Sequence, residues 1–287
     1  MYSPSKDYLS DDMRRNRVSF AEHFLEHTHV AAWHNHVAID PCITILPSTC
    51  AQTEDQLVAA MGVMKMMSPG SRFKGANLRA PTTAKTQGRP EDKVHWSPVF
   101  ARGKLFIYVC DRNAAARDPR LPAQLNNGAG VAKFVNNVLP GILTQMQQQY
   151  GWADTPRTVV HDKASYFVAP RSQRLAQPFA AALHAGKLKS WLGDTDADCS
   201  WLAGRLGDVY PHETAIRHIR SGLEERFPCG APGETLAQFA RRVAKVQTHI
   251  NSDEFSAPSG GGLAALARCL RCRCQRMLEL QGGRLRT

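Results

Sequence analysis

Three acidic residues stand where a fold could bring their carboxylates together. Asp40 ends the apolar segment 36–40, Asp162 ends the segment 158–162, and Glu213 opens an amphipathic segment. Residues at strand ends and helix starts of an α/β fold can converge on one crevice. Carboxylates in such a crevice repel one another unless a divalent cation lies between them. Mg²⁺ or Mn²⁺ suits these oxygen ligands, and two such ions can stabilise both oxygens of an in-line phosphoryl displacement.

Position alone does not establish this chemistry. The chain has 25 Asp and Glu residues, so some of them must fall at strand ends. A glutamate at a helix start also interacts favourably with the helix dipole, whatever its function. Whether the three acids bind metal must therefore be judged from the residues around them.

The elements that must position these acids are predicted from the spacing of apolar residues. With 287 residues, 43% of them hydrophobic, the chain can bury a core. The spacing predicts a helix over 18–33, an extended segment over 36–47, a hairpin over 93–111, a helix over 128–149, a strand over 158–161, a helix over 172–186, a short strand over 188–192, and helices over 212–227 and 234–250. We expect a break after Asp40 and a kink at Pro140, because proline lacks a backbone N–H. The order predicts an α/β fold with a mixed sheet flanked by helices.

The charge balance favours an anionic partner. Lys and Arg number 36 against the 25 acids, which leaves a net charge of +11. Such an excess favours polyanions, because each neutralised phosphate releases condensed counterions. Candidate contacts to a nucleic-acid backbone lie in the long loop before the hairpin and in the segment after Glu213: Arg72, Lys74, Arg79, Lys85, Arg89, Arg217 and Arg220. Solvated loop residues and cations that balance acidic neighbours are the alternative interpretation.

The cysteines and the N-terminal segment indicate the compartment. Eight cysteines are scattered along the chain, which is not the dense framework of a small secreted domain. We expect neither a signal peptide nor a transmembrane helix, and therefore no membrane partner and a reducing compartment. Cys269, Cys272 and Cys274 suggest metal binding, but zinc sites use four ligands and no second pair is near, so a basic helical tail is favoured.

Four segments in succession resemble the mariner-like (Tc/mariner) DDE transposases. They are RRNRVSFAEHFLEHTHVAAWHNHVAID (14–40), KVHWSPVFARGKLFIYVCD (93–111), RTVVHDKASYF (157–167) and YPHETAIRHIRSGLEERF (210–227). Their order and spacing together carry the resemblance, and the closing segment RCLRCRCQRMLELQGGRLRT is similar to the family's last segment. The resemblance implies an RNase H-like catalytic core over 31–252, preceded by a lead-in over 1–30 and followed by a basic tail over 253–287.

The resemblance also implies an activity. Asp40, Asp162 and Glu213 would hold Mg²⁺ or Mn²⁺ for cleavage of double-stranded DNA at element ends and strand transfer to a target. The expected location is the nucleus in a eukaryote, and otherwise the cytoplasm or nucleoid. Whether the chain forms a homodimer is left open, and the residues before the core do not resemble the family's N-terminal helix-turn-helix region.

The chain departs from the family pattern at the acids themselves. Pro41 follows the first acid where the family has Glu, and Lys163 follows the second where it has Asn. The gap before Glu213 is longer than the family norm, so an acid of the intervening segment is an alternative third ligand: Asp194, Asp196, Asp198 or Asp208.

Three functions are therefore compatible with the sequence. The first is a transposase-derived DDE endonuclease and strand transferase. The second is a decayed or domesticated core that binds DNA without cutting it. The third is another RNase H-like nuclease that acts on RNA or on RNA–DNA hybrids.

Overall fold

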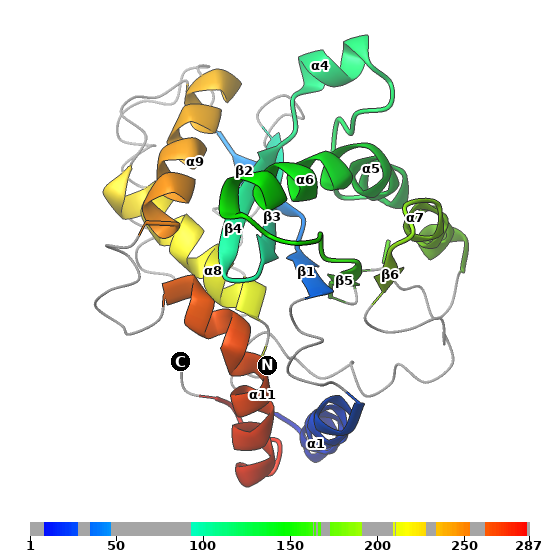
Figure 1. Ribbon diagram of the computed structural model, residues 1–287, viewed down its shortest axis with the longest axis vertical. Coiled ribbons are helices and arrows are strands. Elements are labelled where there is room, and N and C mark those ends of the chain that lie inside the picture. The colour runs from blue at the N-terminus through cyan, green and yellow to red at the C-terminus, as the bar shows by residue number, and fades with distance from the viewer. Residues whose placement is uncertain are drawn as a thin grey trace, which may run out of the picture.

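A mixed sheet of six strands lies at the centre of the protein (Figure 1). The computed structural model describes residues 9–27, 35–46, 93–162, 164, 166–167, 173–190, 209, 211–227, 234–252 and 262–285, with only the backbone at 27, 45, 173–175, 211–213 and 262–270. The strands are β1 (His36–Ile39), β2 (Cys42–Ile45), β3 (Lys93–Ala101), β4 (Lys104–Val109), β5 (Thr158–Val160) and β6 (Lys189–Ser190). β3 pairs antiparallel with β1, β2 and β4, whereas β1–β5 and β5–β6 are parallel pairs. The predicted mixed sheet is confirmed.

β1 and β2 lie one after the other along the same side of β3. Ile39 pairs with Val99 and Cys42 pairs with Trp96, so both strands keep one register along β3. Asp40 lies between the strands with Pro41, which has no N–H for the ladder. The predicted break after Asp40 is thus confirmed.

The β3–β4 hairpin turns at Arg102 and Gly103, inside the predicted turn. Both residues have positive φ, 49° and 75°, as a two-residue type I′ turn requires. The outer edge of β4 is covered by side-chain amides from a C-terminal helix, α9 (Leu236–Ile250). Asn251, which follows α9, bonds both backbone groups of Leu105 through its amide, and Gln247 accepts from the N–H of Ile107. These bonds satisfy an edge that would otherwise be open to other strands.

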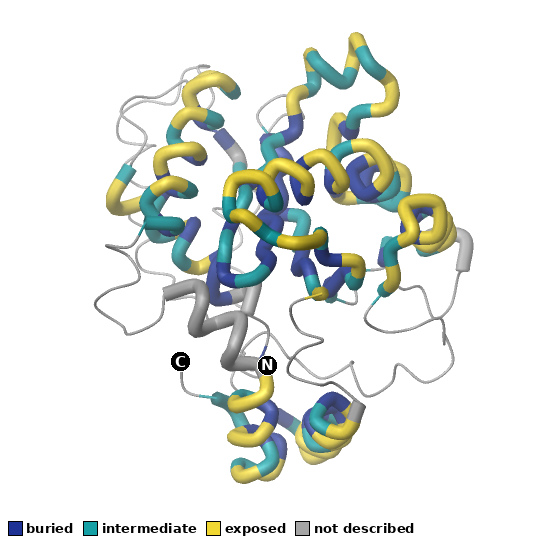
Figure 2. Tube along the Cα trace, viewed as in Figure 1, coloured by how far each residue is buried: buried dark blue, intermediate teal, exposed yellow. Residues whose placement is uncertain are grey.

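Helices cover both faces of the sheet (Figures 1 and 2). One face packs against α5 (Gly128–Lys133), η4 (Phe134–Val138), α6 (Leu139–Tyr150) and α7 (Gln173–Ala185), and the other against α8 (Pro211–Ser221), η6 (Gly222–Arg226) and α9. Alternation along β1 divides its residues between two cores: Val37 and Ile39 face the first, and Ala38 faces the second. A short helix, α4 (Arg112–Arg117), follows β4 and has no buried residue. The helices predicted over 128–149, 172–186, 212–227 and 234–250 are confirmed.

The long helix of the first face contains one π turn, η4, where the sequence predicts a kink. Leu139 donates its N–H to Phe134, five residues earlier. Pro140 follows directly and has no N–H to donate, so the regular ladder cannot continue there. The predicted kink is this π turn.

The two ends of the described chain pack against each other below the sheet (Figure 1). α1 (Asp11–His27) contacts α11 (Gly262–Glu279). Arg17 is fully buried between them and donates to the backbone oxygens of Gly282 and Gly283 at 2.7 and 2.9 Å. The sequence predicted that the first helix starts at residue 18, which was wrong, because α1 starts at Asp11. Asp11 and Asp12 favour a helix N-terminus despite their polarity. None of the helices in the described segments is long and apolar enough to span a membrane.

Candidate functional site

Asp40 and Asp162 follow two neighbouring parallel strands at the same level. Ala38 of β1 pairs with Val160 of β5, and each acid comes two residues after its paired residue. Neighbouring strands lie about 4.8 Å apart, so this register brings the two residues side by side. Ala38 and Val160 both belong to the core on the α8 side, and the alternation of the two strands, if continued to the acids, would direct both of them to that face. Both acids are half-buried.

Tyr166 lies close to both acids and was not predicted from the sequence. Ala164 accepts a bond from the N–H of Phe167 at 2.8 Å, and this turn places Tyr166 against the Phe167 ring with centroids 4.7 Å apart. Burial raises the pKa of the Tyr166 phenol, and the charges of Asp162 and then Asp40 raise it further. The phenol is therefore protonated at neutral pH. An aromatic residue four positions after the second acid was the only available signal, and it is not specific.

The Asp162 carboxylate is held by one backbone group in the described part of the chain. Its Oδ1 accepts from the N–H of Ala164 at 3.0 Å. Burial nevertheless raises the pKa of Asp162, and the bond from Ala164 only partly opposes that shift. Burial disfavours the charged form of this carboxylate, and a nearby cation would favour that form again. Its donor chemistry therefore fits a divalent metal ion.

His161 supports the backbone of Asp162 from the other face of the sheet. Its ring is fully buried between Phe167 and Phe179, with centroids 4.6 and 5.0 Å away. Nδ1 lies 2.7 Å from the backbone oxygen of Asp162, and Nε2 lies 2.8 Å from Oγ of Ser190. Burial lowers the pKa of His161 to about 4, so the ring is neutral at pH 7. The sequence did not indicate a role for His161, because its hydrogen-bond partner Ser190, in β6, is distant in the sequence.

Glu213 lies in the first turn of α8, which packs across β1 and β3. The helix is seated on the sheet by residues of the α8-side core: Ala215, Ile216 and Ile219. The Glu213 side chain lies outside the described residues. Its approach to the other two acids therefore stays a prediction.

The other predicted site residues fall into two groups. Arg217 and Arg220 are exposed on α8, four and seven positions after Glu213. The remaining candidates lie outside the described residues: Arg72, Lys74, Arg79, Lys85, Arg89, Lys163, Asp194, Asp196, Asp198 and Asp208. Of the tail cysteines, Cys272 is exposed and Cys274 is buried, and the Cys269 side chain is not described. Among side chains that the structure does describe, no three His, Cys, Asp or Glu residues gather as a metal site.

The strand order and the helices on both faces define an RNase H-like domain, as the sequence predicts. Solved structures with this arrangement include the catalytic domain of Mos1 mariner transposase, which aligns with a TM-score of 0.52 and 10% identity over 99% of this chain and 100% of that one. The Mos1 mariner paired-end complex with Mn and the Mos1 strand transfer complex each align with a TM-score of 0.53 and 11% identity, over 98% and 100% of this chain.

These comparisons define the fold. The chain spans 66% of the length of the transposase chains in the two complexes. No protein-family model matches the sequence. No curated protein matches it either. The resemblance to mariner-like transposases noted in the sequence is confirmed as a shared catalytic-domain fold.

Proposed function

We propose that this protein is a transposase-derived DDE endonuclease and strand transferase that acts on double-stranded DNA. The observation that carries the proposal is the register of β1 and β5, which brings Asp40 and Asp162 together at the carboxyl ends of neighbouring parallel strands. The likeness to Mos1 complexes with Mn and with Mg supports a divalent metal as cofactor.

The acids of this chain fit a metal by their chemistry. Asp40 and Asp162 would hold Mg²⁺ or Mn²⁺, and Glu213 would complete the ligand set from α8. The bound metal would stabilise the attacking and leaving oxygens of the phosphoryl group being transferred. The Ala164 N–H orients the Asp162 carboxylate, while Tyr166, protonated at neutral pH, adds no further charge beside the acids.

Cations on the same helix support DNA as the substrate. Arg217 and Arg220 follow Glu213 on α8, and their side chains are exposed. Arginines at these positions can contact backbone phosphates without reading the base sequence. The net charge of +11 acts in the same direction, because it attracts polyanions at long range.

The test is metal binding followed by cleavage. We expect calorimetry to detect Mn²⁺ binding to the wild-type protein, and Asp40→Ala and Asp162→Ala each to abolish it. Asp154→Ala is the matched control, because Asp154 is an exposed acid that pairs with Arg102 in the β3–β4 turn and not with Asp40 or Asp162. Mn²⁺-dependent nicking of duplex DNA should then be lost in the same two variants. A wild-type protein that binds no Mn²⁺ would overturn the proposal.

The second candidate is a decayed or domesticated core that binds DNA without cutting. Lys163, directly after Asp162, favours it because a cation there would compete with the metal for the carboxylate. DNA binding that is unaffected by Mn²⁺ and by Asp162→Ala, with no nicking, would favour this candidate. Nicking of RNA–DNA hybrid in preference to duplex DNA would instead favour an RNase H-like nuclease of another substrate class.

A further inference from the structure

His161 joins β5, which ends at the proposed site, to its other parallel neighbour β6. Ser190 is the last residue of β6 and pairs with Val159 of β5. Because side chains alternate along a strand, His161 lies on the same sheet face as Val159. The bond between His161 Nε2 and Ser190 Oγ, 2.8 Å long, therefore links β6 to the residue directly before Asp162.

The hydrogen-bond roles of the ring follow from its partners. A backbone carbonyl can only accept, so Nδ1 must carry the proton and donate to the oxygen of Asp162 at 2.7 Å. In the neutral ring Nε2 is then an acceptor, and it takes the hydroxyl proton of Ser190. The direction of donation therefore runs from Ser190 through His161 to Asp162.

Asp162 is consequently held at two points. The carbonyl of its own peptide is fixed by His161, and its carboxylate accepts from the Ala164 N–H at 3.0 Å. Phe167 and Phe179 pack on the imidazole and stop the ring from rotating out of this arrangement. A donor that is itself immobile fixes the residue that it contacts more tightly than a solvated one.

We infer that His161, oriented by Ser190, is a positioning residue that sets the direction of the Asp162 carboxylate. The inference rests on the proposed function only where Asp162 is treated as a metal ligand. The orientation itself is a property of the folded protein without metal. Supporting residues of this kind typically change metal affinity 10- to 100-fold when they are lost.

The first measurement needs no metal. Amide hydrogen exchange at Ala164 reports the bond to the Asp162 carboxylate, and the Cys110 amide, which donates to the oxygen of His95, reports the sheet. Ser190→Ala removes the hydroxyl donor, and we expect Ala164 to exchange roughly tenfold faster while Cys110 keeps its rate. Ser190→Thr retains a hydroxyl and should restore slow exchange.

The second measurement is the dissociation constant for Mn²⁺. Ser190→Ala should weaken binding roughly tenfold or more, and Ser190→Thr should recover it. Ser221→Ala is the matched control. Ser221 is the last residue of α8, at the other end of the helix from Glu213, and its hydroxyl donates to exposed Glu225. His161→Gln should give the same direction of change as Ser190→Ala, and the serine variants keep the test valid if that variant does not fold.

The outcomes separate the two proposals. Unchanged Ala164 exchange in Ser190→Ala overturns the role of His161, whatever the metal does. Faster exchange with unchanged Mn²⁺ affinity supports the orientation of Asp162 by His161 but overturns the expected effect of that orientation on metal binding. If the wild-type protein binds no Mn²⁺, the proposed function fails, and the exchange measurement alone decides whether His161 orients Asp162.

Discussion

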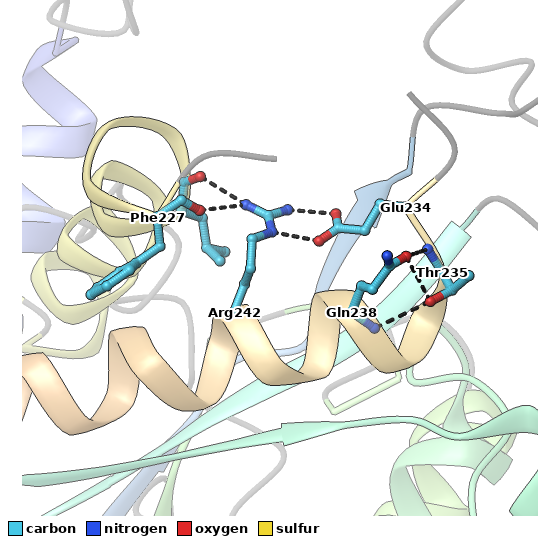
Figure 3. A network of polar contacts seen from close by, with 6 residues as sticks. Phe227, Glu234, Thr235, Gln238 and Arg242 are labelled. Carbon is cyan, nitrogen blue, oxygen red and sulfur yellow. Dashed lines mark hydrogen bonds and ion pairs between the residues drawn. The ribbon is translucent and has the colours of Figure 1, made fainter. Parts of the chain in front are cut away.

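Two polar centres of this protein differ in how completely their charges are balanced. The first joins the start of α9 to η6 (Figure 3). Arg242 makes a two-pronged ion pair with Glu234 at 2.5 and 2.6 Å, and its Nη1 donates to the oxygens of Leu223 and Phe227 at 2.9 Å each. Beside it, Thr235 and Gln238 form a reciprocal capping box at the helix start. In this centre Arg242 and Glu234 neutralise each other's charge, and Nε, Nη1 and Nη2 of Arg242 all donate hydrogen bonds.

The described residues of the second centre, at the carboxyl end of β5, do not balance its charge in this way. His161 is neutral, and the Asp162 carboxylate accepts one backbone bond in the described part of the chain while burial raises its pKa. This difference between the Arg242 and Asp162 centres indicates which of the two is suited to bind a ligand. A centre that neutralises its own charges needs no further ion, whereas a half-buried acid that no cation of the described residues neutralises is suited to bind one.

The largest expected effect is loss of the first centre. Arg242→Ala leaves Glu234 with its charge and only 3% of its side chain exposed, so we expect the free energy of unfolding to fall by about 3–5 kcal/mol. Urea denaturation measures this change. Mn²⁺ affinity should not change, which would distinguish this centre from the second.

The control for that variant is an exposed pair. Arg276 and Glu279 form an ion pair on α11 with more than half of each side chain exposed, and Arg276→Ala should lower stability by under about 1 kcal/mol. Equal losses in the two variants would contradict the contrast drawn between buried and exposed pairs.

The second effect is on the pH dependence of stability. Burial lowers the pKa of His161 to about 4 from its ordinary 6.5, so the folded protein binds this proton less readily than the unfolded chain does. The contribution is complete above pH 6.5 and is lost as the pH falls towards 4, by about 3 kcal/mol in all. Urea denaturation from pH 7 to 4 should show a steeper fall for wild type than for His161→Gln.

Asp162 contributes with the opposite sign. Because burial raises its pKa, its contribution is present below the ordinary carboxyl pKa and is lost as the pH rises through the folded value. Repeating the titration in Asp162→Asn removes this opposing contribution and isolates that of His161. Parallel curves for wild type and His161→Gln in both backgrounds would refute the assignment.

A third change separates function from stability at Asp162. Asp162→Asn removes the incompletely balanced charge, so we expect a fold at least as stable as wild type at pH 7 but Mn²⁺ binding weakened on the order of 100-fold. Thermal unfolding and calorimetry measure the two quantities on one sample. A variant that loses stability while it keeps Mn²⁺ affinity would place Asp162 among the structural centres.

The smallest effect concerns the contact between the two terminal helices. Cys274 is buried on α11 and its pKa is raised by burial to about 12, whereas Cys272 is exposed. Arg17→Lys keeps the charge but loses the two-pronged bonding to Gly282 and Gly283, so α1 should separate from α11 more often. Iodoacetamide labelling of Cys274, followed by peptide mass spectrometry, should accelerate roughly tenfold. Labelling of Cys272 should keep its rate, and a rise at both cysteines would indicate general unfolding instead.

Much of the local structure could be predicted from the sequence. The hairpin turn at Gly103, the break at Pro41 and the disturbance at Pro140 each follow from what one residue's backbone can adopt or donate. The amphipathic helix 236–250 follows from the spacing of its apolar residues, of which Phe239, Val243, Val246 and Ile250 are buried as expected. These features depend on neighbours a few positions away, so a local pattern contains the information.

The site was predictable only in outline. The sequence indicated Asp40 and Asp162 as strand-end acids, but neither Tyr166 nor the bond between His161 and Ser190 could be anticipated. The start of α1 was placed too late, because its polar first turn gives no apolar periodicity and its packing partner, α11, is at the other end of the chain.

The sequence by itself determined most of the segments that become strands and helices, and that two acids follow two apolar strands. The tertiary structure alone decided that those strands are neighbours in a parallel register, that a buried imidazole supports one of the acids, and that Arg17 binds the carbonyls of the last turn. Local backbone preferences are set by short stretches of chain. Contacts between distant segments depend instead on how whole faces pack, and no single stretch of sequence encodes that.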